Sequence, residues 1–307
     1  MIVLDMDNLG IKSKYSFPPV TVAVCVKDGE DTIAQCLNSL KALKYPKDKL
    51  TILVVDNGSK DKTSEIVSSF DVEVINEKKI GRGIARNAAW RATTDEFIAF
   101  TDADCEVNSH WLMHIMPAFE KNNLGVCGSD IVTPGSNDLA RFYELRRIVS
   151  NAEFSGDYPF SPPFLATANA VFRVRAIRDC GGFNEDYRVA EDADICWRIM
   201  QANYTIDYLP GPGITHHHRS TYRKMFNQSV DYGHDAVHLM KNFYPDRVIW
   251  IWFGLYYRLF ISILNIPLSL FKNDSFEKKL PLLDFIRYSG LALGRLSGSI
   301  RFHVLAI

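Results

Sequence analysis

The chain has 307 residues, of which 47% are hydrophobic and 23% are charged, and this composition excludes a disordered or collagen-like chain. Its 35 basic and 36 acidic residues give a net charge of −1, which excludes a uniformly basic nucleic-acid-binding protein. From Pro210 onward, however, 12 Lys and Arg stand against 6 Asp and Glu, and this positive excess suits contact with an anionic surface.

Neither the cysteines nor the N-terminus indicates secretion. The six cysteines form no C-x-x-C pair, which disfavours a zinc ribbon or a thioredoxin-type site. Residues 1–7 lack the basic start and the apolar stretch of a signal peptide. We therefore expect a reducing, cytoplasmic environment.

Strand and helix patterns alternate along the first third of the chain. Apolar, β-branched runs predict buried strands at 20–26, 51–55, 72–75 and 97–100, with helices between them. This alternation predicts an α/β fold with a mostly parallel sheet flanked by helices. Ligands of such sheets bind at the carboxyl ends of the strands, where Asp56, Asp102 and Asp104 fall.

The middle of the chain is less regular. Leu165 to Arg173 predicts a strand, or a turn followed by a strand, and Gly181-Gly182 predicts a turn. Asp192 to Ala202 has the apolar spacing of a helix.

The last part of the chain is apolar and aromatic. The segment 248–271 has about the 20 residues that cross a bilayer, but Arg258 in its middle argues against a span. A narrow polar stripe at helical spacing contains Arg247, Gly254, Arg258, Ser262 and Asn265. A second segment carries Asp284, Arg287, Arg295 and Arg301 on one side. These patterns favour helices lying in a membrane interface, and the alternative is a helical hairpin packed on the domain or on a partner subunit.

Four polar motifs are candidates for chemistry. Asp102 and Asp104 share one side of a strand if the strand continues through them, and a divalent cation would relieve their repulsion; a solvated loop is the alternative. Glu191-Asp192 lies at the start of a predicted helix, where the helix dipole stabilises acidic side chains. The alternative is that a carboxylate at this position serves as a general base. His216-His217-His218-Arg219 offers a metal ligand and a phosphate contact, or a surface loop. Gly81 to Asn87 lacks the third glycine of the dinucleotide fingerprint, which disfavours an NAD enzyme.

The motifs gain meaning from their order along the chain. The series is V-T-V-A-V-C-V, L-V-V-D-N-G-S-K-D-K-T, G-R-G-I-A-R-N-A-A, T-D-A-D, G-G-F-N-E-D-Y, E-D-A-D-I-C-W-R and H-H-H-R. Over about residues 19–220 it resembles the family 2 glycosyltransferases of the GT-A fold. The I-P-x-Y-N that often follows the first strand in that family is replaced here by residues that include Lys27 and Asp28, which leaves the nucleotide open.

The resemblance implies a nucleotide-sugar site. Asp56 would hold the nucleotide base or ribose, and Arg86 would lie on the base side. Asp102 and Asp104 match the D-x-D motif, with Asp104 the closer ligand of a Mg²⁺ or Mn²⁺ ion and Asp102 nearer the ribose.

The resemblance also implies the catalytic and acceptor-side residues. Asp192 would be the catalytic base, with Glu191 beside it on the donor side. His216 would ligate the metal, with His218 as the alternative, and Arg219 would meet the diphosphate. Asn169 would contact the acceptor or donor sugar, with a buried turn asparagine as the alternative.

We thus expect a metal-dependent, inverting transfer from a nucleoside-diphosphate sugar to a hydroxyl of a saccharide or lipid-linked saccharide. Residues 1–220 would form the GT-A catalytic domain, and residues 221–307 a helical region that holds the protein at the cytoplasmic face of a membrane, peripherally or monotopically. No nucleic-acid partner is expected, and a homo-oligomer is left open. The alternatives are a sugar-nucleotide nucleotidyltransferase and a non-catalytic scaffold that binds nucleotide sugars.

Overall fold

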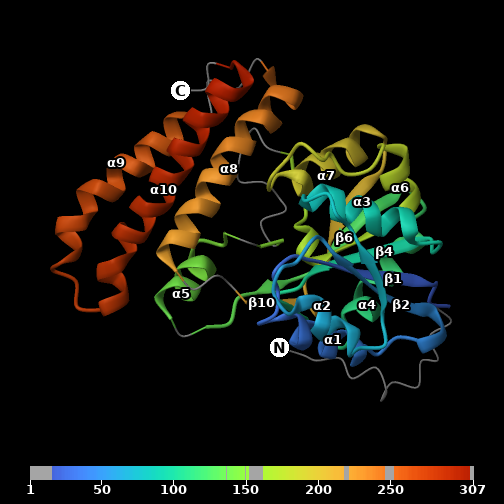
Figure 1. Ribbon diagram of the computed structural model, residues 1–307. Coiled ribbons are helices and arrows are strands. Elements are labelled where there is room, and N and C mark those ends of the chain that lie inside the picture. The colour runs from blue at the N-terminus through green and yellow to red at the C-terminus, as the bar shows by residue number, and fades with distance from the viewer. Residues whose placement is uncertain are drawn as a thin grey trace.

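The computed structural model describes residues 16–135, 137–148, 150–151, 162–217, 221–245 and 252–304. Figure 1 shows two parts, an α/β unit built around a sheet and a group of three long helices that stands beside it. The helix α5 (Asp138–Leu145) lies near the lower end of the long helices.

The central sheet has seven strands and is mostly parallel. Their order is β3 (Glu73–Asn76), β2 (Leu50–Asp56), β1 (Val20–Val26), β4 (Phe97–Asp102), β8 (Ala170–Arg173), β6 (Leu124–Gly128) and β9 (Thr205–Tyr208). Strands β3, β2, β1 and β4 run parallel to one another, and β6 runs parallel to β9. Strand β8 is antiparallel to both β4 and β6. The predicted α/β fold with a mostly parallel sheet is confirmed.

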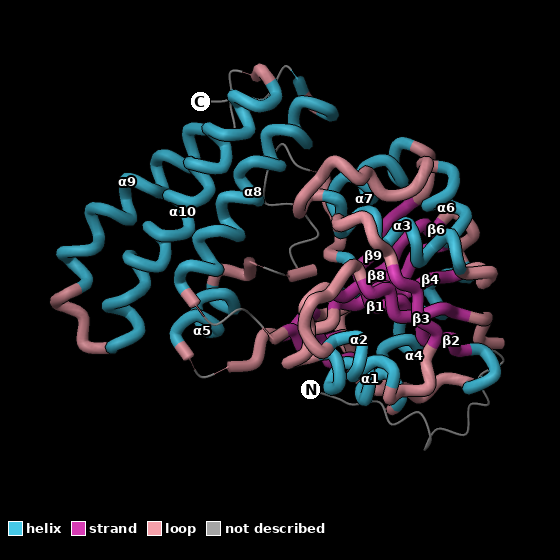
Figure 2. The backbone as a smooth tube through the Cα atoms, in the orientation of Figure 1, coloured by secondary structure: helices cyan, strands magenta, loops and turns pink. Residues whose placement is uncertain are grey.

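Helices cover both faces of this sheet (Figure 2). One face packs on α1 (Ile33–Lys41), α2 (Thr63–Ser68) and α4 (Trp111–Ile115), and the other on α3 (Arg82–Ala92), α6 (Val174–Asp179) and α7 (Glu191–Gln201). Side chains of β1 alternate between these two cores, with Ala23 in one and Val22 and Val24 in the other. A strand buried on both faces must be apolar at every position, which explains the continuous apolar run.

Short elements complete the α/β unit. A second sheet joins β5 (Cys105–Val107), β10 (Ile214–His216) and β7 (Ile131–Val132) in that order. Three 3₁₀ turns, η2 (Lys47–Lys49), η3 (Met116–Glu120) and η4 (Thr167–Asn169), link longer elements. The strand expected over 165–173 is therefore confined to Ala170–Arg173, with η4 before it.

The C-terminal part consists of α8 (Tyr222–Phe243), α9 (Trp252–Ser269) and α10 (Ser275–Phe302). The helices α9 and α10 run in opposite directions, and α10 packs along α8 (Figure 1). Within the described ranges, no helix combines the length and the hydropathy that a membrane span requires.

Glycines let α8 and α10 approach closely. Gly290, Gly294 and Gly298 recur on one side of α10, and each faces the backbone of α8. A Cβ atom on Gly294 would lie 2.0 Å from the carbonyl oxygen of Val230, and one on Gly233 would lie 2.2 Å from that of Leu291. At these glycines a Cβ atom would collide with the facing backbone, so the two helices approach closely there, while side chains such as His238 and Phe302 pack between them elsewhere.

The glycine interface can be tested by substitution. Gly294→Ala is expected to lower the free energy of unfolding by about 1–3 kcal/mol, because the added methyl group overpacks the contact. The control Gly254→Ala places its methyl group in open space on α9 and is expected to raise the free energy by up to about 1 kcal/mol. Urea unfolding measures both, and a stabilised Gly294→Ala would contradict the packing.

Candidate active site

An acidic and a basic side chain from distant parts of the chain, Asp104 and His216, lie close together beside the three-stranded sheet. The antiparallel pairing of β5 with β10 sets His216 opposite Cys105. The backbone N–H of His217 donates to the carbonyl oxygen of Asp104 at 2.9 Å. As a result, the Nε2 atom of His216 lies 3.6 Å from Oδ1 of Asp104.

This pair has the donor atoms that a divalent cation requires. One ligand atom each from Asp104, Cys105 and His216 lie within 4.8 Å of one another. Burial raises the pKa of the Cys105 thiol well above its ordinary value, and a protonated thiol is a poor ligand. Carboxylates suit Mg²⁺ and Mn²⁺, and imidazoles suit transition metals, so Asp104 and His216 offer a donor pair for a divalent cation, whereas Cys105 belongs to the core.

Asp102 is the last residue of β4, and residues 103–104 form a turn. The strand therefore does not continue through Asp104, which was the condition for both carboxylates to project from one side of it. Instead, Asp102 Oδ1 accepts a hydrogen bond from Nη2 of Arg86 at 3.3 Å. The Asp102 side chain remains 34% exposed, which leaves part of the carboxylate accessible.

Arg86 is buried between two acids. Its Nη1 donates to Glu191 at the start of α7, and Arg86 is 5% exposed while Glu191 is fully buried. Burial and the adjacent Asp192 carboxylate raise the pKa of Glu191, and the charges of Arg86 and Arg82 oppose the rise. The guanidinium therefore joins α3, β4 and α7, and its place on the base side of a nucleotide stays a prediction.

Asp192 is oriented by the turn η4. Its Oδ1 accepts from the hydroxyl of Thr167 at 2.6 Å, and its Oδ2 accepts from the Thr167 backbone N–H at 3.2 Å. Asp192 is half-buried, and its charge acts on Arg86. Direct contacts thus link Asp102, Arg86 and Glu191; Asp192 follows Glu191 in the chain, and Asp104, paired with His216, comes two residues after Asp102.

Two other predicted site residues form hydrogen bonds within the protein. Asp56, 4% exposed, accepts from the N–H of Ser59 at 2.9 Å and from the Ser64 hydroxyl. Burial raises the pKa of Asp56, but these hydrogen bonds outweigh that effect, and the net shift of the pKa is downward.

Asn169 is fully buried. Its side-chain amide forms hydrogen bonds with Trp111, Ser129 and the carbonyl oxygen of Asp130. This geometry favours the alternative of a buried turn asparagine. His218 and Arg219 lie outside the described residues.

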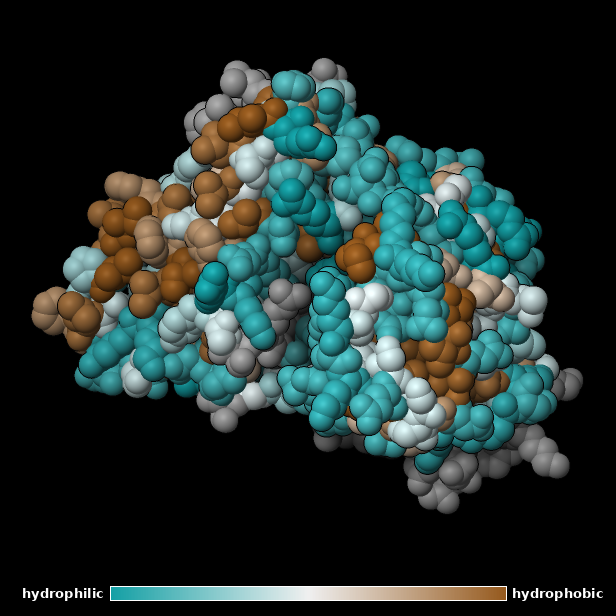
Figure 3. All heavy atoms as spheres, in the orientation of Figure 1, coloured by the Kyte–Doolittle hydropathy of each residue, from teal (hydrophilic) through white to brown (hydrophobic). Residues whose placement is uncertain are grey.

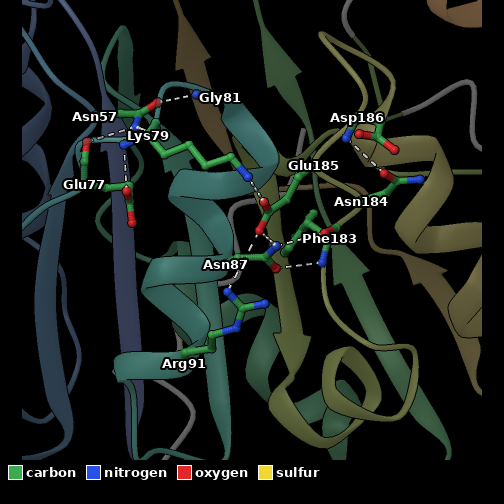
Figure 4. A network of polar contacts seen from close by, with 10 residues as sticks. All are labelled: Asn57, Glu77, Lys79, Gly81, Asn87, Arg91, Phe183, Asn184, Glu185 and Asp186. Atoms are coloured by element: carbon green, nitrogen blue, oxygen red, sulfur yellow. Dashed lines mark hydrogen bonds and ion pairs between the residues drawn. The ribbon is translucent and has the colours of Figure 1, made fainter.

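A network that the sequence analysis did not assign ties α3 to the loop before α7 (Figure 4). The Asn87 side chain exchanges two hydrogen bonds with the backbone of Phe183, at 2.8 and 2.9 Å, and donates to Glu185 at 3.0 Å. Lys79 Nζ lies 2.7 Å from the other oxygen of Glu185. The asparagine of A-R-N and the acid of N-E-D were visible in the sequence, but only the fold shows that they meet.

The same loop constrains the start of α3. A Cβ atom on Gly83 would lie 2.6 Å from the carbonyl oxygen of Asn184, and Asn57 Oδ1 accepts from the Gly81 N–H at 2.8 Å. These contacts fix three loops that border the carboxyl edge of the sheet, and they explain why the G-R-G motif tolerates no larger residue at Gly83.

Comparison with known protein families gives a match over residues 21–181 to the family described as glycosyl transferase family 2. The chain is 29% identical to the pre-mycofactocin glycosyltransferase of Mycobacterium tuberculosis over 238 residues, which cover 74% of this chain and 48% of that protein. It is 28% identical to the beta-monoglucosyldiacylglycerol synthase of Trichormus variabilis, covering 65% and 45%. The chain therefore spans about half the length of these curated relatives.

Solved structures share the fold. A mannosyltransferase from Pyrobaculum calidifontis, in complex with GDP-Man and Mn²⁺, superposes with a TM-score of 0.57 at 18% identity, covering 93% of this chain and 76% of that chain. S. aureus TarS 1–349 in complex with UDP-GlcNAc gives a TM-score of 0.50 at 18% identity, covering 93% and 92%. At these identities the likeness concerns the fold alone, and it confirms the predicted GT-A architecture.

The buried ion pair of Arg86 can be tested by stability measurements. Arg86→Met is expected to lower the free energy of unfolding by about 3–5 kcal/mol, because it leaves the Glu191 carboxylate buried without its counter-charge. The double variant Arg86→Met/Glu191→Met should recover part of this loss. Arg91→Met, on the same helix with its side chain 56% exposed, serves as the control and should change stability by less than about 0.5 kcal/mol. Equal effects of Arg86→Met and Arg91→Met in urea unfolding would contradict the ion pair.

Proposed function

The chain belongs to glycosyl transferase family 2, and from that premise we propose that it transfers a sugar from a nucleoside-diphosphate sugar to an acceptor hydroxyl, with inversion at the anomeric carbon. The observations that support this proposal are the Asp104–His216 pair, just after the end of β4, and Asp192, which Thr167 holds and which follows the buried Glu191 of the Arg86 ion pair.

Asp104 and His216 would hold the diphosphate end of the donor through Mg²⁺ or Mn²⁺. A bound divalent cation supplies positive charge next to the diphosphate, whose negative charge grows as its bond to the sugar breaks. The mannosyltransferase of similar fold, which was solved with GDP-Man and Mn²⁺, supports this choice of donor class and cation.

Asp192 would act as the general base. The acceptor oxygen attacks the anomeric carbon opposite the diphosphate, its proton passes to the Asp192 carboxylate, and the electron pair of the broken C–O bond stays on the diphosphate. Both Thr167 hydrogen bonds orient this carboxylate. The neighbouring Glu191 is already neutralised by Arg86, so Asp192 is the acid of this pair that is available for the proton.

The remaining residues would shape the donor side. Asp102 would bind the ribose through the accessible part of its carboxylate, while Arg86 and Glu191 act as positioning residues behind it. Asp56 would set the conformation of the loop after β2 on which the nucleotide rests. The contact of Arg219 with the diphosphate and the alternative metal ligand His218 stay predictions.

The acceptor is proposed to be a saccharide or glycolipid at a membrane surface. Relatives named as a glucosyldiacylglycerol synthase and as an O-antigen chain rhamnosyltransferase support acceptors of this class. In this proposal, residues 1–220 bind the donor and residues 221–307 hold the protein peripherally at the cytoplasmic face of the membrane. Exposed apolar side chains on α9 and α10 support the role of the helical part.

Asp192→Asn tests the base. It keeps one oxygen acceptor for Thr167, gives up the second and removes the proton-accepting charge, so nucleotide release should slow by about 10²–10⁴-fold without a change in nucleotide affinity. Release of nucleotide from UDP-, GDP- and dTDP-sugars with Mg²⁺ or Mn²⁺ provides the measurement. Asp48→Asn, an exposed acid in the turn η2, is the matched control. Full activity in Asp192→Asn would exclude the assigned base, and absence of turnover in the native chain with every donor would favour the scaffold alternative.

Chelation tests the cation. EDTA should abolish nucleotide release, and added Mn²⁺ should restore it. Mn²⁺ affinity, measured by electron paramagnetic resonance without any substrate, should fall by about 100-fold or more in Asp104→Asn, because the loss of a ligand exceeds the usual cost of losing an outer-shell partner. Asp31→Asn, an exposed acid, should bind Mn²⁺ normally. Unchanged Mn²⁺ binding in Asp104→Asn would place the cation elsewhere.

A further inference from the structure

The three long helices carry their hydrophobic side chains on the outside. Twelve of the eighteen large hydrophobic side chains that are exposed in the described part of the chain belong to α9, α10 and the turn between them. We call these the outer apolar face: Tyr256, Tyr257, Phe260, Ile263, Leu264, Leu268, Leu270, Phe271, Leu282, Leu293, Leu296 and Ile300. Figure 3 shows hydrophobic residues gathered over α9 and α10, whereas the visible face of the α/β unit is mostly hydrophilic.

The polar stripe of α9 borders a groove between α9 and α10. Arg258, Ser262 and Asn265 line it together with Tyr257 and Leu268; Ser262 is buried, whereas Arg258 and Asn265 are exposed. Phe260 and Leu264, on the same helix, are 58% and 47% exposed. A helix of a water-soluble bundle buries its apolar side chains, so the exposed apolar side chains of α9 suit an apolar environment.

The groove is a sizeable polar cavity. It has a volume of about 760 Å³ and is closed at one side by Arg146, at the end of α5. Arg146 forms two hydrogen bonds with Asp284 of α10, which raise the pKa of Arg146, and the charge of Arg258 opposes that rise. The positive charge of Arg258 is therefore close enough to Arg146 to affect its pKa. Lys272 and Glu277 stand at the other end of the groove.

The charges in the groove favour an anion. Three cations, Arg146, Arg258 and Lys272, face two carboxylates, those of Asp284 and Glu277. The lining therefore carries one more positive than negative charge. Arg258 supplies the planar donors that suit a phosphate, and the Asn265 amide and the Tyr257 hydroxyl add neutral hydrogen-bonding groups beside it.

We infer that this groove binds the phosphate headgroup of an anionic membrane phospholipid, while the outer apolar face lies at the boundary between headgroups and acyl chains. An in-plane helix of this kind buries its apolar side by several ångströms, and basic side chains next to it meet the negative leaflet surface. The inference deepens the proposed membrane association and rests on it, but it does not depend on the catalytic residues.

The headgroup site can be tested with vesicles of phosphatidylcholine, with and without phosphatidylglycerol. In co-sedimentation, the full chain should bind vesicles that contain phosphatidylglycerol, and Arg258→Gln/Lys272→Gln should weaken this binding by about tenfold, since each basic residue near an anionic surface contributes measurably. The matched control Lys44→Gln/Lys78→Gln removes the same charge from exposed positions of the α/β unit and should bind as the native chain does. The charge-preserving variant Arg258→Lys/Lys272→Arg should retain most binding, which guards against a folding defect.

A separate variant tests how much the exposed apolar side chains contribute to vesicle binding. Phe260→Ser/Leu264→Ser should weaken binding to both kinds of vesicle, whereas Val74→Ser, an exposed hydrophobic residue of β3, should not. Sedimentation velocity distinguishes the other occupant of such a face, because a second copy of the chain would make Phe260→Ser/Leu264→Ser shift a dimer to a monomer.

Several outcomes would overturn the inference. These are the absence of vesicle binding, equal losses in Arg258→Gln/Lys272→Gln and in its lysine control, and a dimer that dissociates in the apolar variant. Displacement of the protein from vesicles by inorganic phosphate at constant ionic strength would show a site for free phosphate instead. Nucleotide release measured without vesicles reports separately on the proposed function, so the two can fail independently.

Discussion

The arrangement of the site depends on one buried cation, the guanidinium of Arg86. It enters the interior from α3 and meets the carboxylates of Asp102, at the end of β4, and Glu191, at the start of α7. A buried charge is tolerated only when it is paired, so these three elements cannot separate without a large cost. Asp102 is itself one of these partners and Asp192 follows the other, Glu191, in the chain, so the contacts of Arg86 restrain the positions of both carboxylates.

Sequence patterns predicted the sheet, the strand ends and the acidic positions, because a strand buried on both faces leaves a continuous apolar run such as Val20–Val26. They failed where the structure is short or non-local. The two- and three-residue strands β7 and β10 are too brief to show a period, yet β10 carries His216 to Asp104. The sequence pattern also did not show that β4 ends before Asp104, where the chain turns. The partners of Arg86 and Asn169 lie too far away in the sequence for a spacing rule to identify them.

In the C-terminal part, the sequence predicted the helices and their polar stripe but did not show which side of each helix meets a neighbour. The structure answers this through packing. Gly290, Gly294 and Gly298 bring α10 against α8, and α9 packs on α10 with Ser262 and Ser269 buried, while many of its aromatic and aliphatic residues stay exposed. The structure thus shows the helical hairpin, and the interfacial helix remains a proposal.

The glycine contact between α8 and α10 has a mechanical consequence. Where a glycine of one helix meets the backbone of the other, there is no side chain that could rearrange, so a displacement of α10 must move α8 with it. Burial raises the pKa of Tyr232 in α8, and the positive charge of Arg82, in the first turn of α3, opposes that rise, which places these two side chains near each other. A shift of α10 would therefore reach the start of α3 through α8.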